Sequence, residues 1–168
     1  AYVSTDGKEA LLVSDTDGKN VRQLTPAAMT AGASVWSPDN KRLVFLARPY
    51  AALGTVQAAE GQLHTIDVDG KNLKPLANSP HGAEQPRIAK DGRLAYLRNY
   101  PRSGKLPRAD LVVGEGDEAK AIVKNTFINE FAWSPDAKSI AYSTYGALVF
   151  HDVATGKEQP LALPGTDG

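Results

Sequence analysis

The sequence repeats a short motif three times, and this repeat constrains the fold more than any other feature. The two strongest copies lie at residues 35–45 and 132–142, and both contain Trp-Ser-Pro-Asp followed by an apolar run. A degenerate copy at residues 87–96 lies between them and lacks both the tryptophan and the proline. The turn aspartates of the copies, 52 and 45 residues apart, are Asp39, Asp91 and Asp136. A period of about 40–50 residues is typical of arrays built from one supersecondary unit per repeat.

Each repeat contains four short apolar segments that we predict to be β-strands. The segments are rich in Val, Ile, Leu, Phe and Tyr and are separated by turns that contain Gly, Asp, Asn or Pro. No long window keeps the apolar spacing of three and four residues that predicts a helix. Four strands per repeat at this period predict an all-β protein made of β-propeller blades, each a four-stranded antiparallel meander.

The repeats divide the chain into about four blades of a single partial propeller domain. The predicted blades cover residues 1–25, 26–77, 78–124 and 125–163, and the first lacks its innermost strand. A propeller ring usually takes about four to eight blades, and residues 164–168 are too short and polar to supply the missing strand. We therefore expect part of a larger propeller, or a propeller completed by a second chain.

Three motifs resemble the repeat of the TolB family, a WD-repeat-like β-propeller blade. They are Trp-Ser-Pro-Asp-Asn at 36–40, Leu-His-Thr-Ile-Asp-Val-Asp-Gly at 63–70 and Gln-Leu-Thr at 23–25. The sequence departs from the family pattern at Asn40 and Ala137, which stand where the family has the turn glycine. The resemblance covers nearly the whole chain and implies the fold. It does not specify a function, because the family includes scaffolds, enzyme lids and catalytic rings.

The composition excludes several functional classes. The 19 Lys and Arg residues balance the 19 Asp and Glu residues, so no net charge attracts nucleic acid, and we expect no nucleic-acid partner. No apolar run approaches the roughly 18 residues that a membrane-spanning helix needs, and we expect no membrane insertion. The chain contains no cysteine, which excludes thiol nucleophiles, zinc-thiolate sites and disulfides.

No residue pattern indicates catalysis. The motif serines, Ser37 and Ser134, lie in turn motifs and not in a Gly-x-Ser-x-Gly elbow. The three histidines show no spacing that predicts a shared site; they are His64, His81 and His151. We therefore predict no catalytic residue and no cofactor in this segment.

Two Asp-x-Asp-Gly segments, residues 15–20 and 67–72, resemble the start of a calcium loop. Both lack the glutamate that such a loop needs at its twelfth position, where Pro26 and Asn78 stand instead. Asp-Gly is also a strong hairpin signal. We therefore predict hairpin turns and no metal site, with weak surface calcium binding as the alternative.

The motif tryptophans, Trp36 and Trp133, are predicted to pack between neighbouring blades, because each ends an innermost strand. The alternative is an aromatic platform for a sugar or a nucleobase. The aspartates that follow them, Asp39 and Asp136, are predicted to stabilise tight turns through backbone hydrogen bonds.

The extra chain length is concentrated on one face of the predicted ring. The connections between second and third strands, residues 48–61 and 98–108, are long, and they emerge on the same face as the blade-to-blade connections. The opposite face carries only tight turns. Long ordered loops usually persist because they have a function, so we predict binding at this insert-bearing face.

The candidate binding residues on the insert-bearing face are basic or aromatic. They are Arg48, Tyr50, Arg98, Tyr100, Arg102, Lys105 and Arg108. The two inserts emerge on one rim, so we expect the first insert to approach the second. Such side chains are enriched at binding hot spots and suit a carboxylate-rich peptide, an acidic polysaccharide or a phosphate. The alternative is a solvated loop that only keeps the sheet edge soluble.

Two functions from different classes follow from these features. The first is a non-catalytic scaffold for protein or peptide binding, which the TolB resemblance implies to be periplasmic or extracellular. The second is the propeller domain of an enzyme, either the lid of a prolyl-oligopeptidase-like peptidase or a polysaccharide-degrading propeller, with catalysis outside this segment. In both cases the open edges of an incomplete ring favour self-association.

Overall fold

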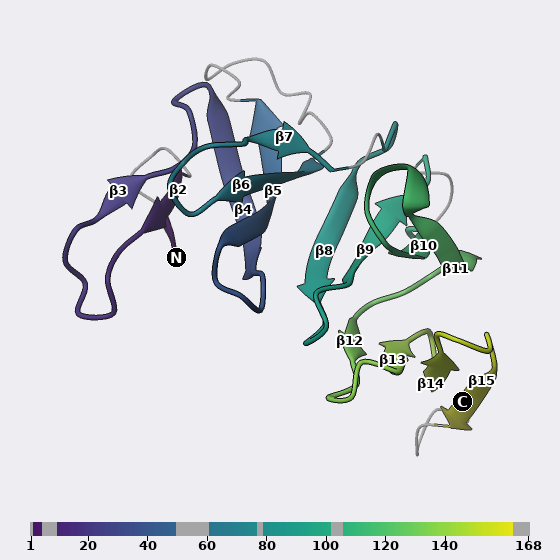
Figure 1. Cartoon of the computed structure of the whole chain (residues 1–168). Helices are drawn as coiled ribbons and strands as arrows, with labels where there is room; N and C mark the ends of the chain where they lie inside the picture. The colour runs from purple at the N-terminus through teal and green to yellow at the C-terminus, as the bar shows by residue number, and fades with distance from the viewer. Residues whose placement is uncertain (1, 5–9, 50–60, 77–78, 102–105, 163–168) are drawn as a thin grey trace. The chain divides into compact units, whose positions relative to one another are not determined.

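The computed structural model describes residues 2–4, 10–49, 61–76, 79–101 and 106–162 of the chain (Figure 1). Within these ranges the chain forms fifteen β-strands and one turn of 3₁₀ helix, Gly116–Glu118. The strands form four sheets, and within each sheet the neighbours in space are neighbours in sequence. The predicted all-β meander architecture is therefore confirmed.

The four sheets follow one another along the chain. The first has the described strands β1 (Tyr2–Ser4), β2 (Ala10–Val13) and β3 (Arg22–Gln23). The second has β4 (Met29–Trp36), β5 (Arg42–Pro49), β6 (Gln62–Asp67) and β7 (Lys74–Pro75). The third has β8 (Ala83–Ile88), β9 (Leu94–Asn99), β10 (Ala109–Val113) and β11 (Lys120–Thr126). The fourth has β12 (Phe131–Trp133), β13 (Ser139–Ser143), β14 (Ala147–Asp152) and β15 (Glu158–Ala162).

The chain divides into two compact units, residues 1–86 and 87–168. The first unit contains the first two sheets. The second unit contains the third and fourth sheets, except that β8 begins before the boundary. Each unit has a hydrophobic core of its own.

The core of the first unit joins its two sheets. Leu11 and Val13, which alternate along β2, pack in one cluster with Leu43 and Phe45 of β5 and Ile66 of β6. All five side chains are buried. Alternate residues of a strand point to one face, so this cluster fixes which faces of the two sheets meet.

The core of the second unit is built in the same way. Leu97 of β9 and Leu111 of β10 pack in one cluster with Phe131, Ile140 and Tyr142 of the fourth sheet. Each of these side chains is buried. Burial of such large side chains contributes about 1.5–3 kcal/mol each, so sheet-on-sheet packing holds the unit together.

The two Trp-Ser-Pro-Asp motifs form the same tight turn. The serine hydroxyl donates to the aspartate carboxylate over 2.6 Å in both copies, from Ser37 to Asp39 and from Ser134 to Asp136. The same carboxylate oxygen accepts the backbone N–H two residues on, at 3.1 Å in both copies. The predicted role of these aspartates in turns is confirmed.

Both turns place a residue other than glycine in the left-handed region. Asn40 has φ 58° and Ala137 has φ 61°, whereas the third copy has Gly92 at φ 90°. Asparagine tolerates this conformation, but alanine carries a cost of about 1–2 kcal/mol. The serine and aspartate hydrogen bonds therefore hold Ala137 in a conformation that its side chain disfavours.

The two Asp-x-Asp-Gly segments are hairpin turns of one design. Asn20 donates its amide to Asp15, and Asn72 donates to Asp67, both over 2.6 Å. The second aspartate of each segment accepts a hydrogen bond from the backbone N–H of the lysine two residues on. It also forms an ion pair with the side chain of that lysine. These oxygens are engaged within their own turns, which supports the hairpin interpretation over a calcium loop.

The connections between strands have two very different lengths. Those joining β4 to β5, β8 to β9 and β12 to β13 are tight turns. The β5–β6 connection takes up residues 50–61 and the β9–β10 connection takes up residues 100–108, both at the opposite ends of the strands. The predicted concentration of length at one end of the sheets is observed, although the β13–β14 connection at that end is short.

Candidate functional site

A buried carboxylate organises the insert-bearing end of the third sheet. Asp110 stands opposite Arg98 in the β9–β10 register. Its Oδ2 accepts a hydrogen bond and ion pair from Arg98 Nη2 at 2.7 Å, and the two side chains are 5% and 38% exposed. The ion pair holds Arg98 in place, because the buried carboxylate of Asp110 would be left uncompensated without it.

A β-bulge supplies the second partner of this carboxylate. The β10–β11 register shifts next to Asp110, where Ala109 pairs with Thr126 but Leu111 pairs with Val123. Asn125, in the bulge, has φ 48° and donates its backbone N–H to Asp110 Oδ1 at 3.0 Å. Bulges re-aim backbone groups beside functional sites. Here the bulge turns a backbone donor toward the buried acid.

The far side of the bulge binds a second arginine. Arg108 Nη1 donates to the carbonyl oxygen of Asn125 at 2.8 Å. The backbone N–H of Tyr100 donates to the carbonyl of Arg108 at 2.9 Å, which closes the base of the insert. These two hydrogen bonds therefore fix the chain where it enters the insert after β9 and where it leaves the insert before β10.

The pKa directions agree with this geometry. Burial raises the pKa of the Asp110 carboxyl, but the hydrogen bonds from Arg98, the Asn125 N–H and the Tyr100 phenol together hold it below its ordinary value. The hydrogen bond to Asp110 raises the pKa of Tyr100 and that of Arg98. The site therefore keeps a charged acid, a charged base and a protonated phenol at neutral pH.

Three side chains of this insert are exposed to solvent. Tyr100 is 39% exposed and Leu106 is 47% exposed, and Arg108 is also exposed. We call Tyr100, Leu106 and Arg108 the insert rim. It offers one ring, one apolar side chain and one guanidinium whose partner in the structure is a neutral carbonyl, a combination that suits recognition of a carboxylate beside an apolar group.

The seven predicted binding residues have different outcomes. Arg98, Tyr100 and Arg108 come together around Asp110 and Asn125. Arg48 lies in β5 of the first unit, with an exposed side chain. Tyr50, Arg102 and Lys105 lie outside the described residues. The approach of the first insert to the second stays a prediction.

The structure alters the chemical role of one predicted residue. Arg98 was expected to be available to an anionic ligand, but its guanidinium already neutralises Asp110. Asp110 and Asn125 were not singled out from the sequence, although both belong to the site. Their contribution depends on strand register and on a bulge, and neither is visible in the composition of the insert.

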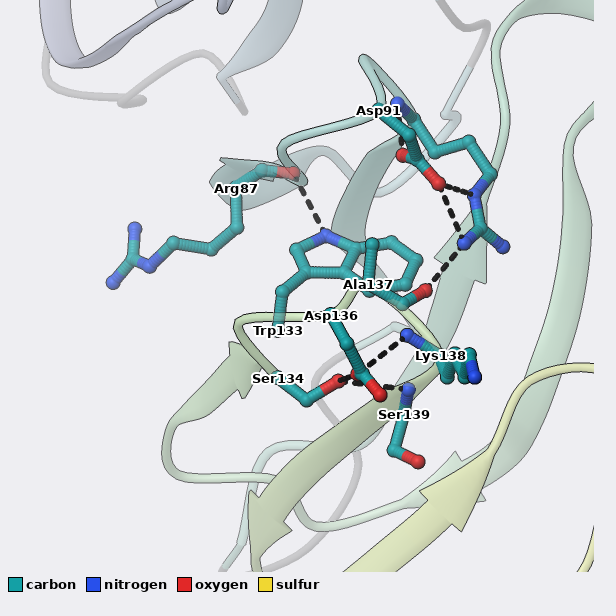
Figure 2. Close-up of polar contacts among 9 residues, drawn as sticks. Arg87, Asp91, Trp133, Ser134, Asp136, Ala137, Lys138 and Ser139 are labelled. Carbon is teal, nitrogen blue, oxygen red and sulfur yellow. Dashed lines mark hydrogen bonds and ion pairs between the residues drawn. The ribbon is translucent and has the colours of Figure 1, made fainter.

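Trp133 packs against the neighbouring sheet of its own unit. Figure 2 shows its indole N–H directed at the carbonyl oxygen of Arg87, at 3.3 Å. The Arg93 guanidinium lies 5.0 Å from the ring centroid. Arg93 also pairs with Asp91 and donates to the Ala137 carbonyl. With both its edge and its ring occupied by protein, Trp133 fits the packing prediction and not the platform alternative.

A polar cluster that the sequence did not indicate lies in the fourth sheet. His151 is buried, and its Nδ1 lies 3.1 Å from Glu158 Oε1. The hydroxyl of Tyr142 donates to the same oxygen over 2.9 Å. Burial and this hydrogen bond raise the pKa of Tyr142 strongly. The histidine is too enclosed to reach a ligand, so the cluster ties three strands together.

The described residues give little sign of a metal site or of a membrane-spanning segment. Among the described residues, no group of three or more His, Asp or Glu side chains is arranged to hold a metal ion. No helix in the described part of the chain is long and apolar enough to span a membrane. A shallow hollow in the first unit has a mixed-charge lining: Arg42, Thr65, Asp67, Asn72, Leu73 and Lys74.

Comparison with known proteins places the fold. No protein-family model matches the chain, and no curated protein matches it. Among solved structures, TolB from Acinetobacter baumannii is 22% identical, with a TM-score of 0.64 over 96% of this chain and 40% of that one. A puromycin hydrolase is 20% identical, with a TM-score of 0.71 over 92% of this chain and 27% of that one. An oligogalacturonate lyase from Vibrio parahaemolyticus is 15% identical, with a TM-score of 0.65 over 92% of this chain and 48% of that one.

These similarities extend over nearly all of this chain but under half of each of those proteins. Identities below 25% establish the fold and not the activity. The Trp-Ser-Pro-Asp turns, the consecutive four-stranded meanders and the structural matches agree with one another. The chain therefore has the fold of the TolB-like β-propellers.

Proposed function

We propose that this chain is a non-catalytic propeller domain that binds a protein or peptide partner at the insert-bearing end of the third sheet. The observation that carries the proposal is the contrast between the base and the rim of the insert. The base is fixed by the buried Asp110 with Arg98 and the Asn125 N–H, whereas Leu106, Arg108 and the ring of Tyr100, whose hydroxyl also bonds Asp110, are exposed. A preorganised base lowers the entropic cost of presenting a rim to a partner.

The chemistry of the rim favours an acidic partner segment. Arg98 and Asp110 neutralise each other, so the base contributes little net charge. Arg108 retains its positive charge, and its guanidinium binds a neutral carbonyl oxygen. A peptide with a carboxylate beside an apolar residue would satisfy Arg108 while covering Tyr100 and Leu106.

The proposal also covers the compartment in which the protein acts and a second candidate function. The TolB-like fold supports a periplasmic or extracellular site of action. The second candidate function is the propeller domain of an enzyme, which the likeness to a puromycin hydrolase and to an oligogalacturonate lyase favours. A Gly-x-Ser-x-Gly elbow elsewhere in the same reading frame would decide for a peptidase.

The binding proposal is tested with labelled glutamate-rich, lysine-rich and uncharged peptides of equal length, by fluorescence anisotropy over a range of salt concentrations. We expect the glutamate-rich peptide to bind best. Arg108→Ser and Leu106→Ser should each weaken that binding about tenfold, which corresponds to about 1.4 kcal/mol. Arg108→Ser should also reduce the salt dependence.

Lys138→Ser is the matched control, because Lys138 is an exposed base at the opposite, tight-turn end of the second unit. It should leave the affinity unchanged. Equal binding of all three peptides, or equal losses for Lys138→Ser and Arg108→Ser, would contradict the proposal. Arg98 is left intact, because its loss would strand the buried carboxylate and confuse binding with stability.

A further inference from the structure

The bulge in β11 uses both backbone polar groups of Asn125. The N–H donates to the buried Asp110 carboxylate at 3.0 Å, and the carbonyl oxygen accepts a hydrogen bond from Arg108 Nη1 at 2.8 Å. The Asp110 side chain is 5% exposed, so the first of these bonds is made inside the protein. The second holds an exposed guanidinium against the backbone of β11. The head of Arg108 is therefore anchored on β11, although Arg108 itself lies just before β10.

A second exposed base, Lys124, lies directly before Asn125 in β11. The register shift between β10 and β11 leaves Lys124 and Asn125 together opposite Asp110. Consecutive Cα atoms are about 3.8 Å apart, so the flexible stem of Lys124 begins beside the residue that binds Arg108. In the described part of the chain, the Lys124 ammonium has no hydrogen-bond or ion-pair partner. Two cationic groups are thus anchored on adjacent residues.

The acids that the structure describes in the second unit do not neutralise Arg108 or Lys124. The Asp110 carboxylate is already paired with an arginine of β9, and Glu130 is paired with Arg87 at 3.5 Å. Every other described acid of this unit lies at its tight-turn end, in or next to a connection between strands. The insert-bearing end of the third sheet therefore presents two positive charges close together.

We propose that Arg108 and Lys124 act as a pair, and that the partner segment carries two carboxylates spaced to meet both of them. This inference rests on the proposed function and goes beyond it by naming the spacing of acids that the site selects. A single exposed ion pair contributes little to binding. Two acids at a matching distance occupy both bases in one complex, because the second contact forms at a high effective concentration once the first has formed.

Two labelled proline-rich peptides of equal length and composition test the pair. The two glutamates are three residues apart in the close-pair peptide and nine apart in the distant-pair peptide. A polyproline II helix places them on the same face in both, about 9 Å and about 28 Å apart. Only the close pair can meet two bases that are anchored on adjacent residues. Fluorescence anisotropy should show the wild type binding the close-pair peptide about fourfold more tightly, with a steeper loss of affinity at higher salt.

Lys124→Ser should remove the preference for the close-pair peptide and leave the affinity for the distant-pair peptide almost unchanged. Arg108→Ser should also remove the preference, but it should weaken the binding of both peptides. Lys120→Ser is the matched control, because Lys120 is an exposed base of the same strand, about 13 Å away beside the 3₁₀ turn. This control should keep the preference of the wild type.

The outcomes separate this inference from the proposed function. Binding of both peptides with equal affinity, or the same loss of preference in Lys120→Ser as in Lys124→Ser, would overturn the pair and leave an acid-binding site in place. Binding of neither peptide, together with no binding of the longer glutamate-rich peptide, would overturn the proposed function and the pair with it.

Discussion

Aspartates at the two ends of the sheets have opposite roles. At the tight-turn end, Asp39 and Asp136 are exposed, and they accept hydrogen bonds from residues two positions away. At the insert-bearing end, Asp110 is buried, and its partners Arg98 and Asn125 lie 12 and 15 residues away. An exposed aspartate here fixes a local turn, whereas the buried one fixes strand register and the root of an insert.

The pKa shifts have the same direction but different causes. At Asp39 and Asp136, the serine hydroxyl first and then the backbone N–H lower the pKa of the carboxyl. At Asp110, burial opposes ionisation and three hydrogen bonds overcome it. The first arrangement depends on a five-residue segment, from the serine to the lysine. The second depends on the packing of three strands.

The largest loss of stability is expected at Trp133, which anchors a tight turn to the neighbouring sheet. Trp133→Ala removes a large side chain that packs on the core of the second unit and donates to Arg87. It should lower the free energy of unfolding by about 3–5 kcal/mol, measured by urea denaturation. His64→Ala, at a partly buried histidine in the first unit, should cost much less. A urea midpoint that does not move with Trp133→Ala would show that this turn is held by local bonds alone.

Asp110→Asn should have the next largest effect, about 2 kcal/mol, because it weakens hydrogen bonds from a charged donor at a buried position. The pH dependence gives the sharper result. A carboxyl whose pKa is lowered by folding contributes stability above its unfolded value of about 3.9, and this contribution is lost as the pH falls.

The difference in stability between the wild type and Asp110→Asn should therefore be full at pH 7 and should shrink below about pH 4. Thermal denaturation of both proteins from pH 7 to pH 3 measures it. A difference that is constant over this range would mean that Asp110 does not act through its charge.

A smaller loss, about 1 kcal/mol, is expected for Ser134→Ala and for Ser37→Ala. Each hydroxyl donates to the turn aspartate and accepts a backbone N–H at about 3 Å. The third copy of the motif has Ala89 at this position and still closes its turn with Gly92 and Asp91. Urea midpoints that shift by similar amounts in both variants would confirm that the two turns are equivalent. A loss as large as that of Trp133→Ala would contradict a local role.

The smallest expected change is a gain in stability on substitution of Ala33, which lies within β4 and at neither end of its sheet. Ala33 has φ 32° at the register shift within β4, and its side chain is exposed. Ala33→Gly relieves a left-handed alanine but adds unfolded-state freedom, so we expect a net gain of about 0.5 kcal/mol. A decrease in the melting temperature would show that the shifted backbone is not strained.

The tight-turn end could be predicted from the sequence because its interactions are local. Trp-Ser-Pro-Asp and Asp-x-Asp-Gly contain their own hydrogen-bond partners within six residues. The period of the repeat could be predicted from the spacing of Asp39, Asp91 and Asp136, because each of these aspartates marks a local turn. Even Ala137 in a glycine position was visible as a departure from the pattern.

The insert-bearing end could be predicted only in outline. Its length and basic residues were visible, but the pairing of Arg98 with Asp110 depends on the β9–β10 register and on the bulge at Asn125. The His151 and Glu158 contact depends likewise on the β14–β15 register. Charge counting treated Arg98 as available to a ligand, because the buried acid opposite it lies beyond the insert.

The claim that the insert-bearing end is the binding end is tested most directly by backbone amide chemical shifts of the isotopically labelled chain during titration with a glutamate-rich peptide. We predict that saturable shifts appear around Tyr100, Leu106, Arg108 and Asn125, and that the turns around Asp39 and Asp136 stay unchanged. Shifts centred on those two turns, or no saturable shift at either end, would contradict the account.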